Sequence, residues 1–212
     1  MRLEKMLGVF ALLTAAAVVP ASATIYDLTS DHCTGTCGTA PFGNIELLQS
    51  GTTVDVTVHL NSPNYFVKTG AGDSQAFIFN ATGVLLADIS IDAHVPGLTA
   101  STGSFGTGAV GDFGFGIGCS SCGNGAPGFN TDIVFHVANA TIADLTAPNA
   151  SGNVFVADIF SNNLNGLTGN GNTGLVDASV PRSSVPEPVT SGLVGTGLAS
   201  LFFLRRRFAG KA

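Results

Sequence analysis

The sequence has no tryptophan, only two tyrosines and only eight basic residues among its 212 residues. Tryptophan and tyrosine rings supply the flat surfaces on which sugar rings stack, so the sequence offers little for that mode of glycan binding. Between Thr24 and Val185 the basic residues are Lys68 and Arg182 alone. Twelve acidic residues in that segment give it a formal charge of −10. Two cations cannot neutralise a row of phosphates, which argues against a nucleic-acid partner.

Sequence patterns that carry catalysis are also absent. There is no Gly-x-Ser-x-Gly elbow for a nucleophilic serine, no EF-hand aspartate spacing for calcium, and no carboxylate pair that stands out. The four histidines are spread along the chain, and the sequence predicts His59 and His136 on outward strand faces and His32 in a solvated loop. We therefore expect a protein that is not an enzyme, with no cofactor and no bound metal.

The first 23 residues have the three parts of a secretory signal peptide. A start with two basic residues is followed by an apolar stretch at residues 7–19, which is too short to span a bilayer comfortably. Ala21 and Ala23 then supply the small side chains of a cleavage site, so the mature chain is expected to begin at Thr24. An uncleaved anchor helix is the alternative interpretation.

The segment 185–208 has three parts in a fixed order. It begins with a tetrapeptide that its two prolines keep out of a helix, made of Val185, Pro186, Glu187 and Pro188. The uncharged residues 189–204 follow, and as a transmembrane helix they would reach about 24 Å, short of a hydrocarbon core of roughly 30 Å. A basic cluster then favours a cytoplasmic C-terminus, and it consists of Arg205, Arg206 and Arg207.

This arrangement resembles the PEP-CTERM sorting signal, and the similarity covers residues 185–208. The resemblance implies that exosortase, a membrane-embedded cysteine protease-transpeptidase, recognises Pro186, Glu187 and Pro188 and removes the tail. The arginine cluster is then the membrane stop signal. Hosts of this family are Gram-negative-type bacteria that make exopolysaccharide. The protein is therefore expected in the inner membrane transiently, and afterwards at the outer surface or in a biofilm or floc matrix. A plain C-terminal anchor is the alternative.

Between the ends, apolar and polar residues alternate with a period of two, which predicts strands. The strand candidates are residues 45–49, 53–60, 65–68, 76–80, 85–92, 110–117, 132–138 and 154–160. Turn residues separate them, which favours an all-β, antiparallel β-sandwich with a jelly-roll-like or immunoglobulin-like outline. We place this domain at residues 24–161. Residues 162–184 are rich in Asn, Gly and Ser and are predicted to form a flexible stalk.

Four cysteines fall into two close pairs, Cys33 with Cys37 and Cys119 with Cys122. In an exported protein an even number of cysteines predicts disulfides. Adjacency favours two local bridges on kinetic grounds, whereas loop closure favours long-range bridges energetically. The spacings also fit a Cys₄ zinc site, although an oxidising destination makes thiolates hard to keep. These alternatives stay open at the level of the sequence.

Together these features predict a non-enzymatic, exported structural or adhesive protein of the cell surface or exopolysaccharide matrix. The expected partners are exosortase, transiently, and exopolysaccharide. One alternative is a carbohydrate-binding module for the matrix polysaccharide. A second alternative is a secreted hydrolase, which would need a clustered pair of acids.

Overall fold

The structure, a computed structural model, describes residues 23–95, 97–106, 108–120, 122, 128–161 and 171–182. Ala21 and the whole sorting segment 185–208, including the expected helix at 189–204, lie outside the described residues. Within the described part, no helix has the length and apolar character needed to cross a membrane. The first strand begins at Ala23, one residue before the predicted start of the mature chain.

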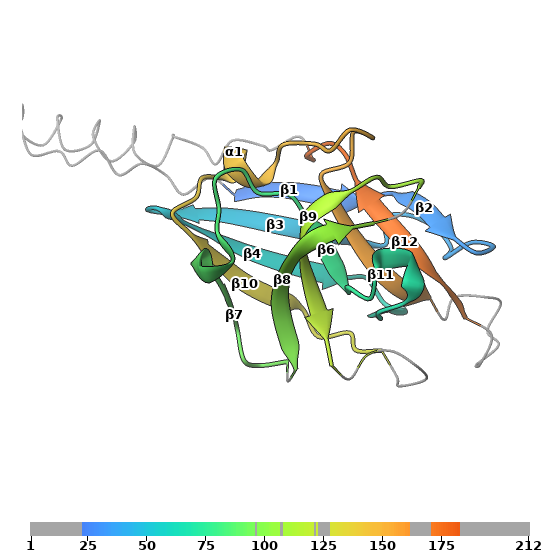
Figure 1. Cartoon of the computed structure of the whole chain (residues 1–212). Coiled ribbons are helices and arrows are strands. Elements are labelled where there is room, and N and C mark those ends of the chain that lie inside the picture. Colours follow the sequence, from blue (N-terminus) through green and yellow to red (C-terminus); the bar gives the residue numbers. More distant parts are fainter. Residues whose placement is uncertain are drawn as a thin grey trace, which may run out of the picture. The chain divides into compact units, whose positions relative to one another are not determined.

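The described residues form two antiparallel β-sheets packed as a sandwich, which confirms the predicted all-β class (Figure 1). Sheet A has the order β1-β3-β4-β10-β7. Its strands are β1 (Ala23–Leu28), β3 (Gly43–Ser50), β4 (Thr53–Leu60), β10 (Ile133–Ala138) and β7 (Ile89–Ile91). The predicted alternation holds along β4, where Val54, Val56 and Val58 are fully buried.

Sheet B has the order β2-β12-β11-β6-β9-β8, and β5 also pairs with β11. Its strands are β2 (Ser30–Cys33), β5 (Asn64–Phe66), β6 (Phe77–Phe79), β8 (Leu98–Phe105), β9 (Phe113–Cys119), β11 (Phe155–Ser161) and β12 (Asn172–Ala178). Short helices connect some strands: η2 (Gly70–Gly72), η3 (Leu86–Asp88) and α1 (Ile142–Leu145).

Aromatic rings fill the space between the sheets. Phe79 of sheet B and Phe135 of sheet A have ring centroids 5.2 Å apart. Tyr26 of sheet A meets Phe155 of sheet B edge to face at 5.1 Å. Such pairs contribute about 0.5–1.5 kcal/mol beyond the area that they bury. Tyr26 is only 5% exposed, so its ring belongs to the core and offers no surface platform.

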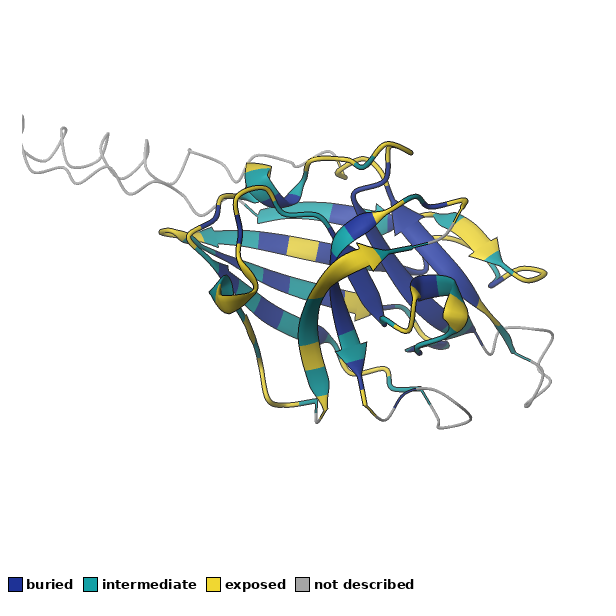
Figure 2. Ribbon diagram, in the orientation of Figure 1, coloured by how far each residue is buried: buried dark blue, intermediate teal, exposed yellow. Residues whose placement is uncertain are grey.

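The outer face of sheet B is also covered around β11 and β12 (Figure 2). A second apolar cluster lies there, made of Ile78, Val110, Phe113, Val156 and Leu175. Strands covered on both faces are expected to be apolar at nearly every position rather than alternating. This explains why β11 is apolar at every position except Asp158 and Ser161.

The predicted boundary between domain and stalk is wrong. Strand β12, at Asn172–Ala178, lies inside the predicted stalk 162–184 and pairs with β11 over seven residues. The sandwich therefore extends at least to Arg182, whose backbone N–H donates to the carbonyl of Ile25. Residues 162–170 lie outside the described residues. The predicted strand 85–92 is a second error, because its first part forms η3 and only Ile89–Ile91 is a strand.

Candidate functional site

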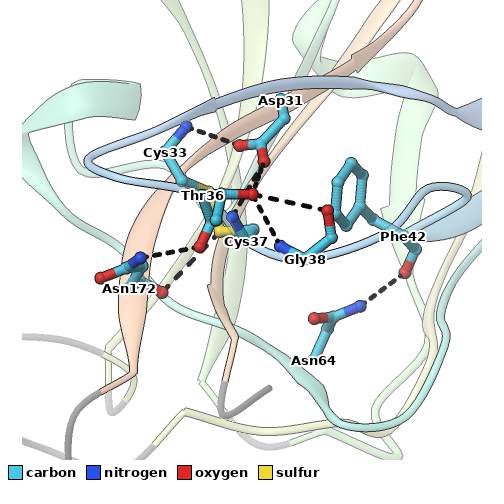
Figure 3. The surroundings of a disulfide bond; sticks show 8 residues. All are labelled: Asp31, Cys33, Thr36, Cys37, Gly38, Phe42, Asn64 and Asn172. Atoms are coloured by element: carbon cyan, nitrogen blue, oxygen red, sulfur yellow. Dashed lines mark hydrogen bonds between the residues drawn. A yellow bond between two sulfur atoms is a disulfide. The ribbon is translucent and has the colours of Figure 1, made fainter. Parts of the chain in front are cut away.

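The cysteines form two local disulfides, Cys33–Cys37 and Cys119–Cys122. The first one closes the loop that follows β2 (Figure 3). Asp31 organises this loop, because its carboxylate accepts hydrogen bonds from the backbone of Cys33 and Cys37, both at 2.9 Å, and from the Thr36 hydroxyl at 2.8 Å. Partial burial opposes ionisation of Asp31, but these hydrogen bonds outweigh it, and its pKa is lowered.

This pairing disagrees with the zinc alternative. The carboxylate oxygen of Asp31 and the two sulfurs of Cys33 and Cys37 do lie within 4.8 Å of one another. The sulfurs are bonded to each other, however, and a zinc ligand must be a free thiolate. The same holds for Cys119 and Cys122. The four cysteines therefore serve as loop closures in this structure.

A group of titratable side chains lies on the outer face of sheet A, and we call it the histidine–aspartate face. Its members are Asp55, His59, Asp92, His94, Asp132 and His136. They come from β4, from β10 and its approach, and from the segment just after β7. All six are exposed or half-buried. This agrees with the predicted outward or half-exposed positions of the histidines at 59 and 136.

His136 lies between two carboxylates. Its Nδ1 is 2.6 Å from Asp55, the residue opposite it on β4, and its Nε2 is 3.2 Å from Asp92. The hydrogen bond to Asp55 is the main cause of a raised pKa for His136, partial burial acts against it, and Asp92 adds to the rise. The imidazolium form can donate to both carboxylates at once. Asp55 and Asp92 are thus a clustered pair of acids, but the imidazole of His136 lies between them.

The second half of the face is built around Asp132. Its carboxylate lies 2.7 Å from Nδ1 of His59, and its backbone carbonyl lies 2.9 Å from Nε2 of His94. The side chains of His59 and Asp132 are 46% and 40% exposed, so water screens this pair. Exposed ion pairs of this kind contribute about 0.2–1 kcal/mol each.

The interaction that was least predictable from the sequence is the contact between His32 and Asp177. His32 is not in a solvated loop, as predicted, but in strand β2. Its Nε2 lies 2.5 Å from a carboxylate oxygen of Asp177, whose side chain is only 2% exposed. A nearly buried carboxylate needs such a partner, because an unpaired one would lose its hydration without compensation.

Asp158, on β11, is the other buried carboxylate. One of its oxygens accepts from the backbone N–H of Thr69 at 2.5 Å and from the Thr69 hydroxyl at 2.7 Å. The other oxygen is buried without a hydrogen-bond partner. Burial raises the pKa of Asp158 to about 6, against the lowering effect of the two Thr69 bonds. Near neutral pH this group is therefore ionised, and the two Thr69 hydrogen bonds offset only part of the cost of burying its charge.

Comparisons with known proteins add no relatives. No protein-family model matches the chain, and neither a curated protein nor a solved structure matches it. The function therefore has to be argued from the residues themselves.

The His136 bridge gives a test of how the face behaves with pH. We expect His136→Gln to lower the free energy of unfolding by about 1 kcal/mol at pH 5.5 and by less at pH 8.5. The folded pKa is raised, so the stabilisation is complete below the unfolded value of about 6.5 and disappears as the pH rises through the folded pKa. Urea unfolding at both pH values measures this difference.

The matched control is Ser90→Ala, at the residue opposite His136 on β7. Its hydroxyl does not titrate in this range, so its effect should be the same at both pH values. Equal losses at pH 5.5 and 8.5 for His136→Gln would show that the imidazole contributes only packing.

Proposed function

We propose that this chain is an exported, non-enzymatic structural or adhesive protein of the cell surface or exopolysaccharide matrix. The single observation that carries the proposal is the sequence pattern of the C-terminal segment, in which Val185–Pro188 precedes sixteen uncharged residues and three arginines. Exosortase is the transient partner that reads it. The predicted signal peptide and the membrane helix at 189–204 belong to this proposal. So does a jelly-roll-like or immunoglobulin-like outline of the sandwich.

The fold supports processing of the tail. Pro181 forms a β-bridge with Tyr26, and the guanidinium of Arg182 makes an ion pair with Asp27. All twelve described strands thus precede Val185 in the sequence. Cleavage at or after Pro188 would remove none of them, so the released product keeps its complete sandwich.

A carbohydrate-binding role is the second candidate, and the histidine–aspartate face is the observation that favours it. Exposed imidazoles and carboxylates on a sheet face can hydrogen-bond to sugar hydroxyls. The aromatic residues offer less: Tyr26 is buried, and Tyr65 is half-buried against Phe160, with ring centroids 6.4 Å apart. Pull-down on the host's own polysaccharide, with the wild type and Asp55→Ala, tests this role.

Intact-mass analysis of the protein recovered from its host tests the sorting proposal. We expect a product that lacks the residues after Pro188, with or without an added group. Replacing Pro186, Glu187 and Pro188 together with alanine should leave the tail in place, whereas Ser184→Ala, next to the motif, should be processed normally. A full-length tail that persists in a stable inner-membrane form of the wild type would contradict the proposal.

A further inference from the structure

The outer edge of β8 differs from the other three edges of the sandwich. β1 is covered by residues 181–182, β7 has only three residues, and β2 has four residues that include an aspartate and a histidine. β8 has eight residues without charge or proline. It pairs with β9 on one side. β7 and η3 lie near its other side, but no strand within the described ranges is hydrogen-bonded to β8 there. Natural edge strands are normally protected by shortness, charge or proline.

The hydrogen bonds around β9 show which backbone groups of β8 face outward. Ser120 donates to the carbonyl of Gly97 at 2.9 Å, so this opposed pair is hydrogen-bonded. Ile117, opposite Ala100, directs its carbonyl to Ala76 on the other side of β9. In an antiparallel ladder hydrogen-bonded and non-hydrogen-bonded pairs alternate. The N–H and C=O groups of Leu98, Ala100 and Thr102 therefore face away from β9.

The apolar core is incompletely covered along the same edge. Leu98 and Ala100 of β8, and Ile89 and Ile91 of β7, pack against the core but stay partly exposed. η3 lies against β8, and its region carries two of the three exposed large apolar side chains found among the described residues. These are Leu85, 69% exposed, and Leu86, 42% exposed.

We propose that a second copy of this chain covers this edge, with β8 paired antiparallel to β8 about a two-fold axis. Charge restricts where a second copy can bind. Residues 24–185 carry a formal charge of −10, so two copies repel each other over most of their surfaces, and β8 is an uncharged stretch at which they can meet. A two-fold contact places the same patch on itself. Three acids near this edge have partners of their own: Asp88 accepts from Asn139, Asp92 from His136 and Asp73 from the backbone N–H of Gly106.

The pairing has a defined register. An axis through Ala100 places Ala100 opposite its symmetry mate and Leu98 opposite Thr102, so that the outward backbone groups form about six hydrogen bonds. On the solvent face, Thr99 lies opposite Ser101, a hydroxyl pair that suits adjacent strands. Sheet B then continues through both copies. The proposed matrix role supplies only the biological setting of this pairing. The two proposals are tested separately, because intact-mass analysis tests the sorting and the association state of the protein tests the pairing.

Sedimentation equilibrium of the full-length protein in density-matched detergent tests the pairing. We expect a monomer–dimer equilibrium in the wild type. Thr102→Pro, which removes an outward N–H, and Thr99→Asp, which adds charge to the contact, should each weaken the dimer about tenfold or more. The control is Ser50→Asp, which adds the same charge at an exposed position on sheet A and should change the dissociation constant less than about twofold.

Thermal unfolding of each variant checks that the sandwich is retained, since Thr99 and Thr102 are exposed. If Thr102→Pro fails to fold, Thr99→Asp decides together with hydrogen exchange. Amide protection of Ala100 and Thr102 should then rise with concentration in the wild type. A protein that stays monomeric at millimolar concentration overturns the proposal. A dimer that none of the substitutions weakens also overturns it. So does the finding that β8 pairs only with a strand from an unrelated protein.

Discussion

Replacing Asp158 with asparagine is expected to stabilise the fold at neutral pH, although the residue is buried and hydrogen-bonded. The carboxyl group has a pKa of about 6 in the fold, against an ordinary value of 3.8. Because the folded pKa is raised, the fold is favoured below the unfolded pKa, and stability falls as the pH rises from about 4 to 6. The full shift corresponds to about 3 kcal/mol at most, at 1.36 kcal/mol per pH unit.

The expected gain for Asp158→Asn is about 1–2 kcal/mol at pH 7.5, smaller than the full shift for a structural reason. The asparagine oxygen can still accept both hydrogen bonds from Thr69, but its amide group then occupies the place of the unpartnered oxygen. A buried donor without an acceptor costs part of what removal of the charge gains. The gain should shrink markedly at pH 4, where the wild-type carboxyl is neutral. Chemical denaturation at the two pH values measures both numbers.

Asp31→Asn is the control with the opposite sign. Hydrogen bonds lower the pKa of Asp31, so its ionised form supports the fold. Asparagine there should destabilise at pH 7.5. If Asp158→Asn destabilises the protein equally at pH 7.5 and at pH 4, the prediction is wrong. Another group would then compensate the charge of Asp158.

His32→Ala is expected to destabilise the protein by about 2–3 kcal/mol at pH 7. The substitution leaves the carboxylate of Asp177, 2% exposed, without the imidazole that lies 2.5 Å from it. Removing one partner of a buried pair costs more than the pair contributes, because the remaining charge stays desolvated. His32 itself is 30% exposed, so the expected loss is below the roughly 3–5 kcal/mol of fully buried pairs.

His59→Ala provides a matched comparison, since its partner Asp132 is 40% exposed and can be hydrated once the imidazole is gone. The expected loss there is below about 1 kcal/mol. The double variant His32→Ala, Asp177→Asn should recover part of the loss, because it removes the stranded charge. Equal effects of the two histidine substitutions would contradict the assigned difference in burial.

Strands with a strict alternation were predictable from the sequence, and strands that depend on their neighbours were not. β4 was predicted at the observed residues because one of its faces is entirely valine and leucine. β12 was missed because it follows an Asn- and Gly-rich stretch. Its burial comes from its neighbours β2 and β11 and from η2, which the sequence pattern does not show. β8 was missed because its sequence, rich in Ser and Thr, does not alternate between apolar and polar residues. As an edge strand it is held by its pairing with β9 and does not need an apolar face.

The histidine–aspartate face could be predicted only in part. Periodicity places Asp55 and His59 on the same side of β4. It cannot show that His136, 81 residues after Asp55, stands opposite it, because that depends on the register between β4 and β10. Asp158 and Asp177 carry no sequence signal of burial either. An aspartate within an apolar strand is commonly taken as an outward position, and here both faces are covered.

The contact of Pro181 and Arg182 with β1 has a mechanical consequence. For a protein held by its C-terminal tail, a pulling force enters the sandwich at Arg182. There it meets the Tyr26–Pro181 bridge, the hydrogen bond to Ile25 and the ion pair with Asp27. Tension therefore acts on these contacts between residues 181–182 and β1 before it reaches β12. Because exposed ion pairs weaken with salt, the first rupture event under flow should come at lower force in concentrated salt than in dilute buffer.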